Sequence, residues 1–317
     1  MPATIKRHGA YLAVWALLMV VFWVAINFTD LKDATFGGLG DLTHPFYFGV
    51  LYATSLIIPV VLFNIGVMRN FGGFASYIGR SIGLLSIGAS LWGIGNLIWF
   101  YYNGCTSFPE ALRCSAAIAD NVPYPSWADA GYLALLPFAG LSLYYLTKVL
   151  ALRGGDLVRL LWIPVVIFAI TGWATLPEVF RLDLPSGLGG TFVYGHSTLF
   201  APDYSFAAKA ISSMYVVTDV VLMSLGVMLL WHSRRAAGGI FFAPVLAVAA
   251  GMVSQYVGDL FFFQRVADET FYNGDVSDGL YAISMYLMTL SAFLFARAHH
   301  QMSVGLEQPS PSGEVAA

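Results

Sequence analysis

The sequence predicts an all-α integral membrane protein with eight transmembrane helices. Of its 317 residues, 58% are apolar and only 10% are charged, whereas about a quarter of the residues of a soluble domain are charged. The apolar residues gather in runs of about 20, the length that crosses a bilayer as a helix. A transmembrane barrel would show alternating segments instead. The expected spans are residues 9–28, 45–67, 81–101, 128–148, 158–179, 208–231, 239–263 and 278–297.

The basic residues predict that both termini lie in the cytoplasm. With the N-terminus inside and an even number of spans, ten of the fifteen Lys and Arg residues fall on the cytoplasmic side. The first apolar run is too long for a cleaved signal peptide. We therefore expect a multi-pass protein of the plasma (inner) membrane, with a membrane domain over residues 1–302 and a disordered tail over residues 303–317. The net charge of −3 indicates no nucleic-acid partner.

The loop after the third span holds the two cysteines of the chain, Cys105 and Cys114. Both are expected on the oxidising side of the membrane, nine positions apart, which favours a disulfide that closes this loop. A metal site is the weaker interpretation, because the chain has no CxxC spacing. The sequence therefore predicts a disulfide here and no metal site.

The fourth and eighth spans begin alike. In the fourth, Ser126 is a candidate N-cap, and Asp129 and Tyr132 follow it; in the eighth, Asp278 is followed by Tyr281. An aspartate in a first turn can simply complement the helix dipole, so capping is the alternative to ligand binding.

Polar residues inside three other spans are harder to explain by capping. Asp219 is expected near the bilayer midplane, where an acid costs about 2.5–3.5 kcal/mol to insert, with Tyr215 and Thr218 as its nearest local partners. Gln255 and Asp259 share a helix face, and so do Asn96 and Trp99. Structural pairing is one interpretation, and a ligand site in the outer half of the membrane is the other. The candidate ligand-binding residues are Asn96, Trp99, Asp129, Tyr132, Tyr215, Asp219, Gln255, Asp259, Asp278 and Tyr281.

Equal spacings predict that the chain contains two related halves, residues 1–153 and 154–302. Tyr52 and Tyr215 are 163 positions apart, as are Asn96 and Asp259. Asp129 and Asp278 are 149 apart, which fits an insertion of about fourteen residues at the cysteine loop in the first half. Four spans followed by four keep the same orientation, so the repeat is parallel and a shared site lies between the halves.

Three segments carry a resemblance to a known membrane region: PYPSWADAGYLALLPFAGLSLYYL, MYVVTDVVLMSLGVMLL and VGDLFFF with the later YNGDVSDGLYAISMYL. They resemble the multi-helix region found N-terminal to diguanylate cyclase and histidine kinase domains in bacteria and archaea. The resemblance implies a sensor whose signal leaves through a separate partner, since this chain ends after the eighth span. The residues it marks are Pro125, Ser126, Asp129, Tyr132, Asp219, Asp259, Asp275 and Asp278.

Three functions remain open from the sequence. The first is a sensory or regulatory module that binds a small ligand or cation and signals through a protein partner. The second is a transporter or a proton- or cation-coupled carrier, and the third is an accessory subunit of a larger membrane complex. An enzyme is not expected, because no nucleophile–base pair or HExxH motif is present. No Lys lies mid-span to hold retinal and no His lies mid-span to bind haem, so the cofactor is unknown.

Overall fold

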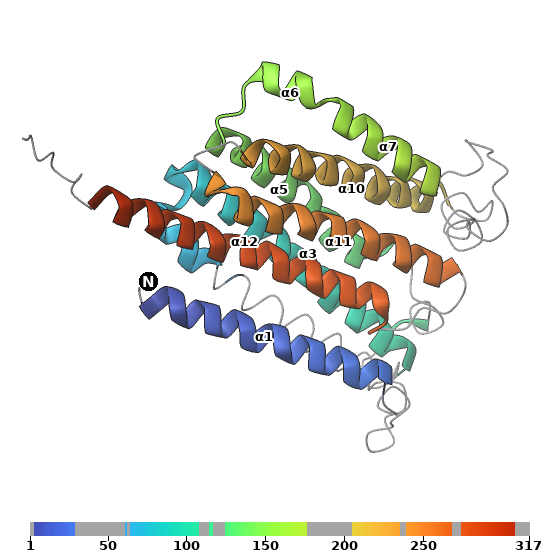
Figure 1. Ribbon diagram of the computed structural model, residues 1–317. Helices are drawn as coiled ribbons and strands as arrows, with labels where there is room; N and C mark the ends of the chain where they lie inside the picture. The colour runs from blue at the N-terminus through green and yellow to red at the C-terminus, as the bar shows by residue number, and fades with distance from the viewer. Residues whose placement is uncertain are drawn as a thin grey trace, which may run out of the picture.

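The computed structural model describes residues 3–28, 61, 64–107, 114–116, 124–175, 205–234, 239–267 and 274–307. Within these ranges the chain is a bundle of long helices without strands (Figure 1). Helices suit such apolar segments because each backbone N–H and C=O is satisfied inside its own segment, away from water. The long helices are α1 (Ala3–Phe28), α3 (Tyr77–Ser107), α5 (Trp127–Val149), α10 (Phe206–Ser233), α11 (Phe242–Ala267) and α12 (Val276–Glu307).

All six long helices are long and apolar enough to cross a membrane. This confirms the expected class, a multi-pass helical membrane protein. The shorter described elements are η4 (Gly73–Ala75), α6 (Gly154–Leu160) and α7 (Trp162–Thr175).

Two expected boundaries differ from the structure. The segment expected to span over 158–179 is broken at Leu161 into α6 and α7, and Pro164 lies in the first turn of α7, where a missing N–H is tolerated. Residues 303–307, expected in the disordered tail, extend α12 to Glu307. Most of the expected span at 45–67 lies outside the described residues.

Most neighbouring helices pack in antiparallel fashion, whereas α5 and α10 run in the same direction. Helix α3 lies along α5, α11 lies along α12, and α10 packs on α5, α7 and α11, while α1 contacts α12 at one side of the bundle (Figure 1). We call the end where α3 and α11 begin the basic end, because Arg80, Lys148 and Arg234 lie there. The opposite end, where α5 and α12 begin, is the aspartate end.

The core is formed mainly by Leu and Met side chains of α3, α5, α10, α11 and α12, with Leu12 and Trp15 of α1. Leu143, Met285 and Met288 are almost completely buried. The outward faces of α1 and α7 are apolar as well, with Leu17 and Phe168 among the exposed side chains. Since hydrocarbon is as apolar as a core, these faces suit contact with lipid.

Glycines bring the helices of both antiparallel pairs into close contact. A Cβ on Gly95 of α3 would lie 2.8 Å from the carbonyl oxygen of Ala128 and 2.9 Å from the ring of Tyr132. A Cβ on Gly258 of α11 would lie 2.7 Å from the ring of Tyr281. Small residues at these positions allow each tyrosine to lie flat against the neighbouring helix backbone, which positions its hydroxyl for the site.

Candidate functional site

Two aspartates from different helices meet inside the bundle. Asp219 is the fourteenth of the 28 residues of α10 and is 2% exposed, and Asp259 of α11 is 9% exposed. Their carboxyl groups lie close enough together to interact directly. Because two ionised carboxylates repel each other at close range inside a protein, such a contact favours a proton on one of the two groups. The other oxygen of Asp219, Oδ2, has no hydrogen-bond partner.

Asp259 is also held by the neighbouring helix. The hydroxyl of Tyr281 on α12 donates a hydrogen bond to Oδ1 of Asp259. Gln255 lies one turn before Asp259 on α11, is buried, and has an amide oxygen, Oε1, without a partner. The acid pair therefore connects α10, α11 and α12, and unpaired oxygens remain beside it.

A second acid, Asp129, is fixed by its own helix start. Its Oδ2 accepts hydrogen bonds from the backbone N–H of Ser126 at 2.7 Å and from the Ser126 hydroxyl at 3.0 Å, as part of a capping box at the start of α5. Its Oδ1 accepts a hydrogen bond from the hydroxyl of Tyr215 on α10 at 3.1 Å. The expected capping role of Asp129 is thus present, together with a contact between helices.

Tyr215 links the two groups of acids. Its hydroxyl bonds to Asp129, and it also lies within electrostatic range of Asp259. The sequence suggested Asp219 as the partner of Tyr215 and Thr218, but Tyr215 bonds to Asp129 and the Thr218 hydroxyl donates to the Met214 carbonyl. The acceptor for Tyr215 therefore comes from the start of α5 and not from its own helix.

The remaining tyrosine pair surrounds a tryptophan that the sequence did not single out as a ligand. The hydroxyl of Tyr132 donates to Oδ1 of Asn96 at 3.2 Å, and Nδ2 of Asn96 has no partner. The ring of Trp92 lies 5.9 Å from that of Tyr132 and 6.0 Å from that of Tyr281. Trp92 precedes Gly95 by about one turn of α3, on the helix face that meets both tyrosines. The spacing between Trp92 and Gly95 is the sequence signal that could have predicted the position of Trp92.

Asp278 and Asp275 organise the start of α12. Oδ1 of Asp275 accepts from the backbone N–H groups of Ser277 at 2.8 Å and Asp278 at 3.4 Å, and Oδ2 forms an ion pair with Nε of Arg265 at 3.7 Å. Oδ2 of Asp278 accepts from the N–H of Gly274. Capping was the alternative to ligand binding here, and these contacts show it for both acids.

Helix α1 forms two side-chain hydrogen bonds with the backbone at the start of α12. Nε1 of Trp23 donates to the carbonyl of Asp275 at 3.0 Å, and Nδ2 of Asn27 donates to that of Gly274 at 2.8 Å. The carbonyl of Asp275 also accepts the backbone N–H of Gly279, so the bond from Trp23 is additional to the one made within α12. Helix α1 is thus joined to the start of α12 by two side-chain hydrogen bonds.

Cys105 at the end of α3 forms a disulfide with Cys114, with the two Cα atoms 5.7 Å apart. The disulfide lies at the aspartate end, beyond Trp99. The carbonyl of Trp99 accepts a hydrogen bond from Asn103 at 2.9 Å. Trp99 thus lies on α3 between Asn96 and the disulfide.

These observations define a multi-pass helical membrane protein with a buried carboxyl pair, flanked by three tyrosines, between its helices. Comparison with protein-family models, with curated proteins and with solved structures finds no match to this chain. Its function is therefore inferred from the site itself.

Proposed function

We propose that this chain is a membrane-embedded sensory or regulatory module that responds to protons or to a small monovalent cation at the Asp219–Asp259 pair. It passes the change to a separate protein partner. The observation that carries this proposal is the close approach of these two buried carboxyl groups, one of which has an oxygen, Oδ2 of Asp219, without a hydrogen-bond partner. Within membranes, ionisable side chains that lie away from helix ends are functional candidates by default.

The chemistry of the pair supplies the switch. If the shared proton leaves, two negative charges face each other in a medium of low dielectric constant, and their repulsion acts directly between α10 and α11. A monovalent cation that replaced the proton would relieve this repulsion and bind the free Oδ2 of Asp219. Binding of a proton or a cation to the pair is therefore coupled to the distance between α10 and α11. A protein partner can detect a change in that distance.

Matching contacts support two parallel repeats, which the hydrogen bond from Tyr215 to Asp129 joins beside the site. Gly88 and Gly251 are 163 positions apart. A Cβ on Gly88 would lie 3.2 Å from the carbonyl oxygen of Leu135, and a Cβ on Gly251 would lie 3.2 Å from that of Ser284. Leu135 and Ser284 are 149 positions apart. Gly95 and Gly258 pack on Tyr132 and Tyr281 with the same two offsets. The same spacings that relate the sequences thus relate the contacts between α3 and α5 to those between α11 and α12.

The direction of the helices supports an eight-span arrangement with both termini on one side. In Figure 1, α1, α3 and α11 run from the basic end, and α5, α10 and α12 run back to it. Since Lys and Arg are retained on the cytoplasmic side, the basic end is the cytoplasmic one, in the plasma (inner) membrane. The acid pair then lies between the midplane and the outer surface, and the signal leaves at the basic end.

The proposal is tested with the protein in liposomes at controlled pH. We expect hydrogen exchange along α10 and α11 to change with pH, and this change to disappear in Asp219→Asn. The control is Asp156→Asn, which alters a partly exposed acid on α6 outside the pair. A response to pH that is the same in Asp219→Asn and in the unaltered protein contradicts the proposal.

A carrier is the second candidate, because Asp219 lies at the middle of its helix, where ions in transit are bound. A pH-sensitive dye inside the same liposomes separates the two functions. A sensor changes conformation without moving protons across the membrane, whereas a carrier acidifies the interior in a manner that depends on Asp219.

A further inference from the structure

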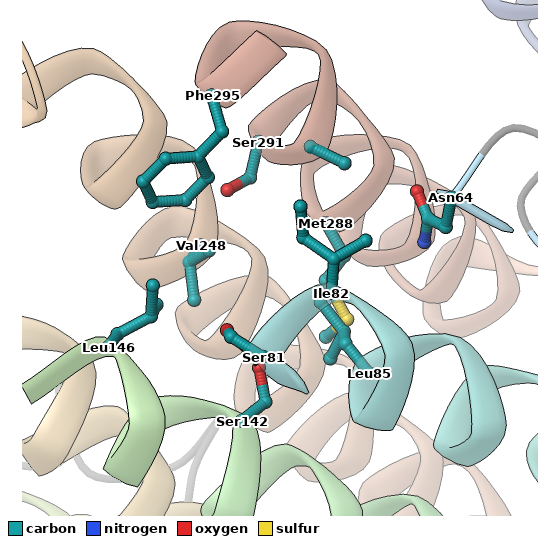
Figure 2. A pocket seen from close by; sticks show the side chains of 11 residues that line it. Asn64, Ser81, Ile82, Leu85, Ser142, Leu146, Val248, Met288, Ser291 and Phe295 are labelled. Atoms are coloured by element: carbon teal, nitrogen blue, oxygen red, sulfur yellow. Dashed lines mark hydrogen bonds between the residues drawn. The ribbon is translucent and has the colours of Figure 1, made fainter. Parts of the chain in front are cut away.

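A second polar site lies toward the basic end, away from the carboxyl pair. Figure 2 shows a small cavity around which side chains of α3, α5, α11 and α12 converge with Asn64. Its polar lining is Asn64, Ser81, Ser142 and Ser291, and apolar side chains that include Met288 form the rest. The cavity has room for about one water molecule.

Asn64 is the feature of this cavity that requires an explanation. Its side chain is fully buried, and neither Oδ1 nor Nδ2 has a hydrogen-bond partner among the residues that the structure describes. Buried amides are nearly always hydrogen-bonded to protein or to an ordered water molecule. The Ser81 and Ser142 hydroxyls satisfy each other at 2.8 Å, so they do not reach Asn64 directly. An occupant of the cavity is needed to connect them.

We infer that this cavity binds one ordered water molecule, held by the Asn64 amide and by the serine hydroxyls. Buried waters typically make about three hydrogen bonds, and the lining offers the amide group and three hydroxyls. The described part of the lining carries no charged side chain that would balance the charge of an ion in this low-dielectric region. A neutral occupant with both donors and acceptors fits best.

The water joins three separate parts of the chain. Asn64 precedes α3, Ser142 belongs to α5, and Ser291 belongs to α12. Ser142 and Ser291 each lie thirteen residues after the aspartate of their own helix, Asp129 or Asp278. The water site therefore lies where the two proposed halves meet, at the opposite end from the carboxyl pair.

Hydroxyl-radical labelling by an X-ray beam tests this inference, because radicals formed from a bound water oxidise the nearest side chains. Met288 lines the cavity, whereas Met285, one turn earlier on α12, does not. Both are 1% exposed, so Met285 is a matched internal control. In nanodiscs we expect Met288 to be oxidised several-fold faster than Met285, and Asn64→Leu to remove this difference. Equal rates in the unaltered protein would overturn the inference.

The same labelling identifies the occupant. Replacing sodium by choline in the buffer should leave the oxidation of Met288 unchanged if the occupant is water. A rate that rises when sodium is withdrawn would mean that a cation had filled the cavity, and would overturn the assignment to water. The comparison of Met288 with Met285 uses the unaltered protein, so the test does not depend on the folding of the variant.

Discussion

The hydroxyl of Tyr281 on α12 donates a hydrogen bond to Asp259 on α11. Tyr132 on α5 makes the corresponding bond to Asn96 on α3, with the same packing against a glycine. The two bonds differ in their acceptor, which is the carboxyl group of Asp259 for Tyr281 and the amide of Asn96 for Tyr132. At this pair of positions the carboxyl group is therefore in the second half of the chain and the amide is in the first.

Removing the two tyrosine hydroxyls should therefore have unequal effects. Tyr281→Phe deprives a buried carboxyl of its donor, and we expect a loss of about 1–3 kcal/mol in unfolding free energy. Tyr132→Phe removes a bond to a neutral amide and should lose about 0.6 kcal/mol, as is usual between membrane helices. Unfolding by denaturing detergent in the same lipid mixture gives both values. A Tyr132→Phe variant as unstable as Tyr281→Phe would contradict this assignment.

Close packing at Gly258 makes a second prediction. In Gly258→Ala the new Cβ would lie 2.7 Å from the Tyr281 ring, so α11 and α12 must separate. Such overpacking costs about 1–3 kcal/mol. The control is Gly140→Ala on α5, where the nearest atom is a Leu222 methyl at 3.7 Å and no loss is expected. Thermal unfolding of both variants checks that Gly258→Ala is the less stable of the two. Equal stabilities would contradict the close contact between Gly258 and Tyr281.

Two variants measure separately how much the helix cap and the ion pair of Asp275 stabilise the start of α12. Asp275→Ala removes the acceptor for two backbone N–H groups, and we expect a loss of about 0.5–2 kcal/mol. Arg265→Gln removes only the partly exposed cation at 3.7 Å and should lose no more than about 1 kcal/mol. Hydrogen exchange over residues 276–280 should rise strongly in the first variant and little in the second. The reverse order would show that the ion pair, not the cap, holds this turn.

The disulfide should act locally. In a variant with Cys105→Ser and Cys114→Ser, the loss of the cross-link between them frees the segment after α3, and the chain-entropy estimate for such a small loop is about 2–3 kcal/mol. We expect faster hydrogen exchange at the end of α3, near Tyr102, and unchanged exchange around Met285 in α12. A uniform increase through the whole bundle would show that the disulfide stabilises the fold as a whole.

Much of the fold and part of the site follow from the sequence by simple physics. Apolar runs of spanning length predict the helices, and the cost of an acid in lipid predicts that Asp219 faces the bundle interior. The i, i+4 spacing of Gln255 and Asp259 places them on one face, toward the place where Asp219 lies. The convergence expected for Asp219 and Asp259 is present, because the two carboxyl groups lie within interaction range of each other.

Contacts that depend on how helices rotate against each other could not be predicted. Tyr215 bonds to Asp129 because the start of α5 meets α10, and its position in the sequence gives no sign of this. The break at Leu161 and the cavity beside Asn64 likewise depend on tertiary packing. The matched positions of Ser142 and Ser291 after the two first-turn aspartates were the one signal of that cavity available from sequence.

The central claim is that Asp219 and Asp259 share a proton inside the membrane, and infrared difference spectroscopy of the protein in nanodiscs tests it most directly. Exposed aspartates are ionised at neutral pH, so a protonated-carboxyl C=O band that persists there reports a buried pair. We predict that this band is present in the unaltered protein and is lost or shifted in both Asp219→Asn and Asp259→Asn. Absence of the band at neutral pH, or a band unaffected by either substitution, would contradict the account.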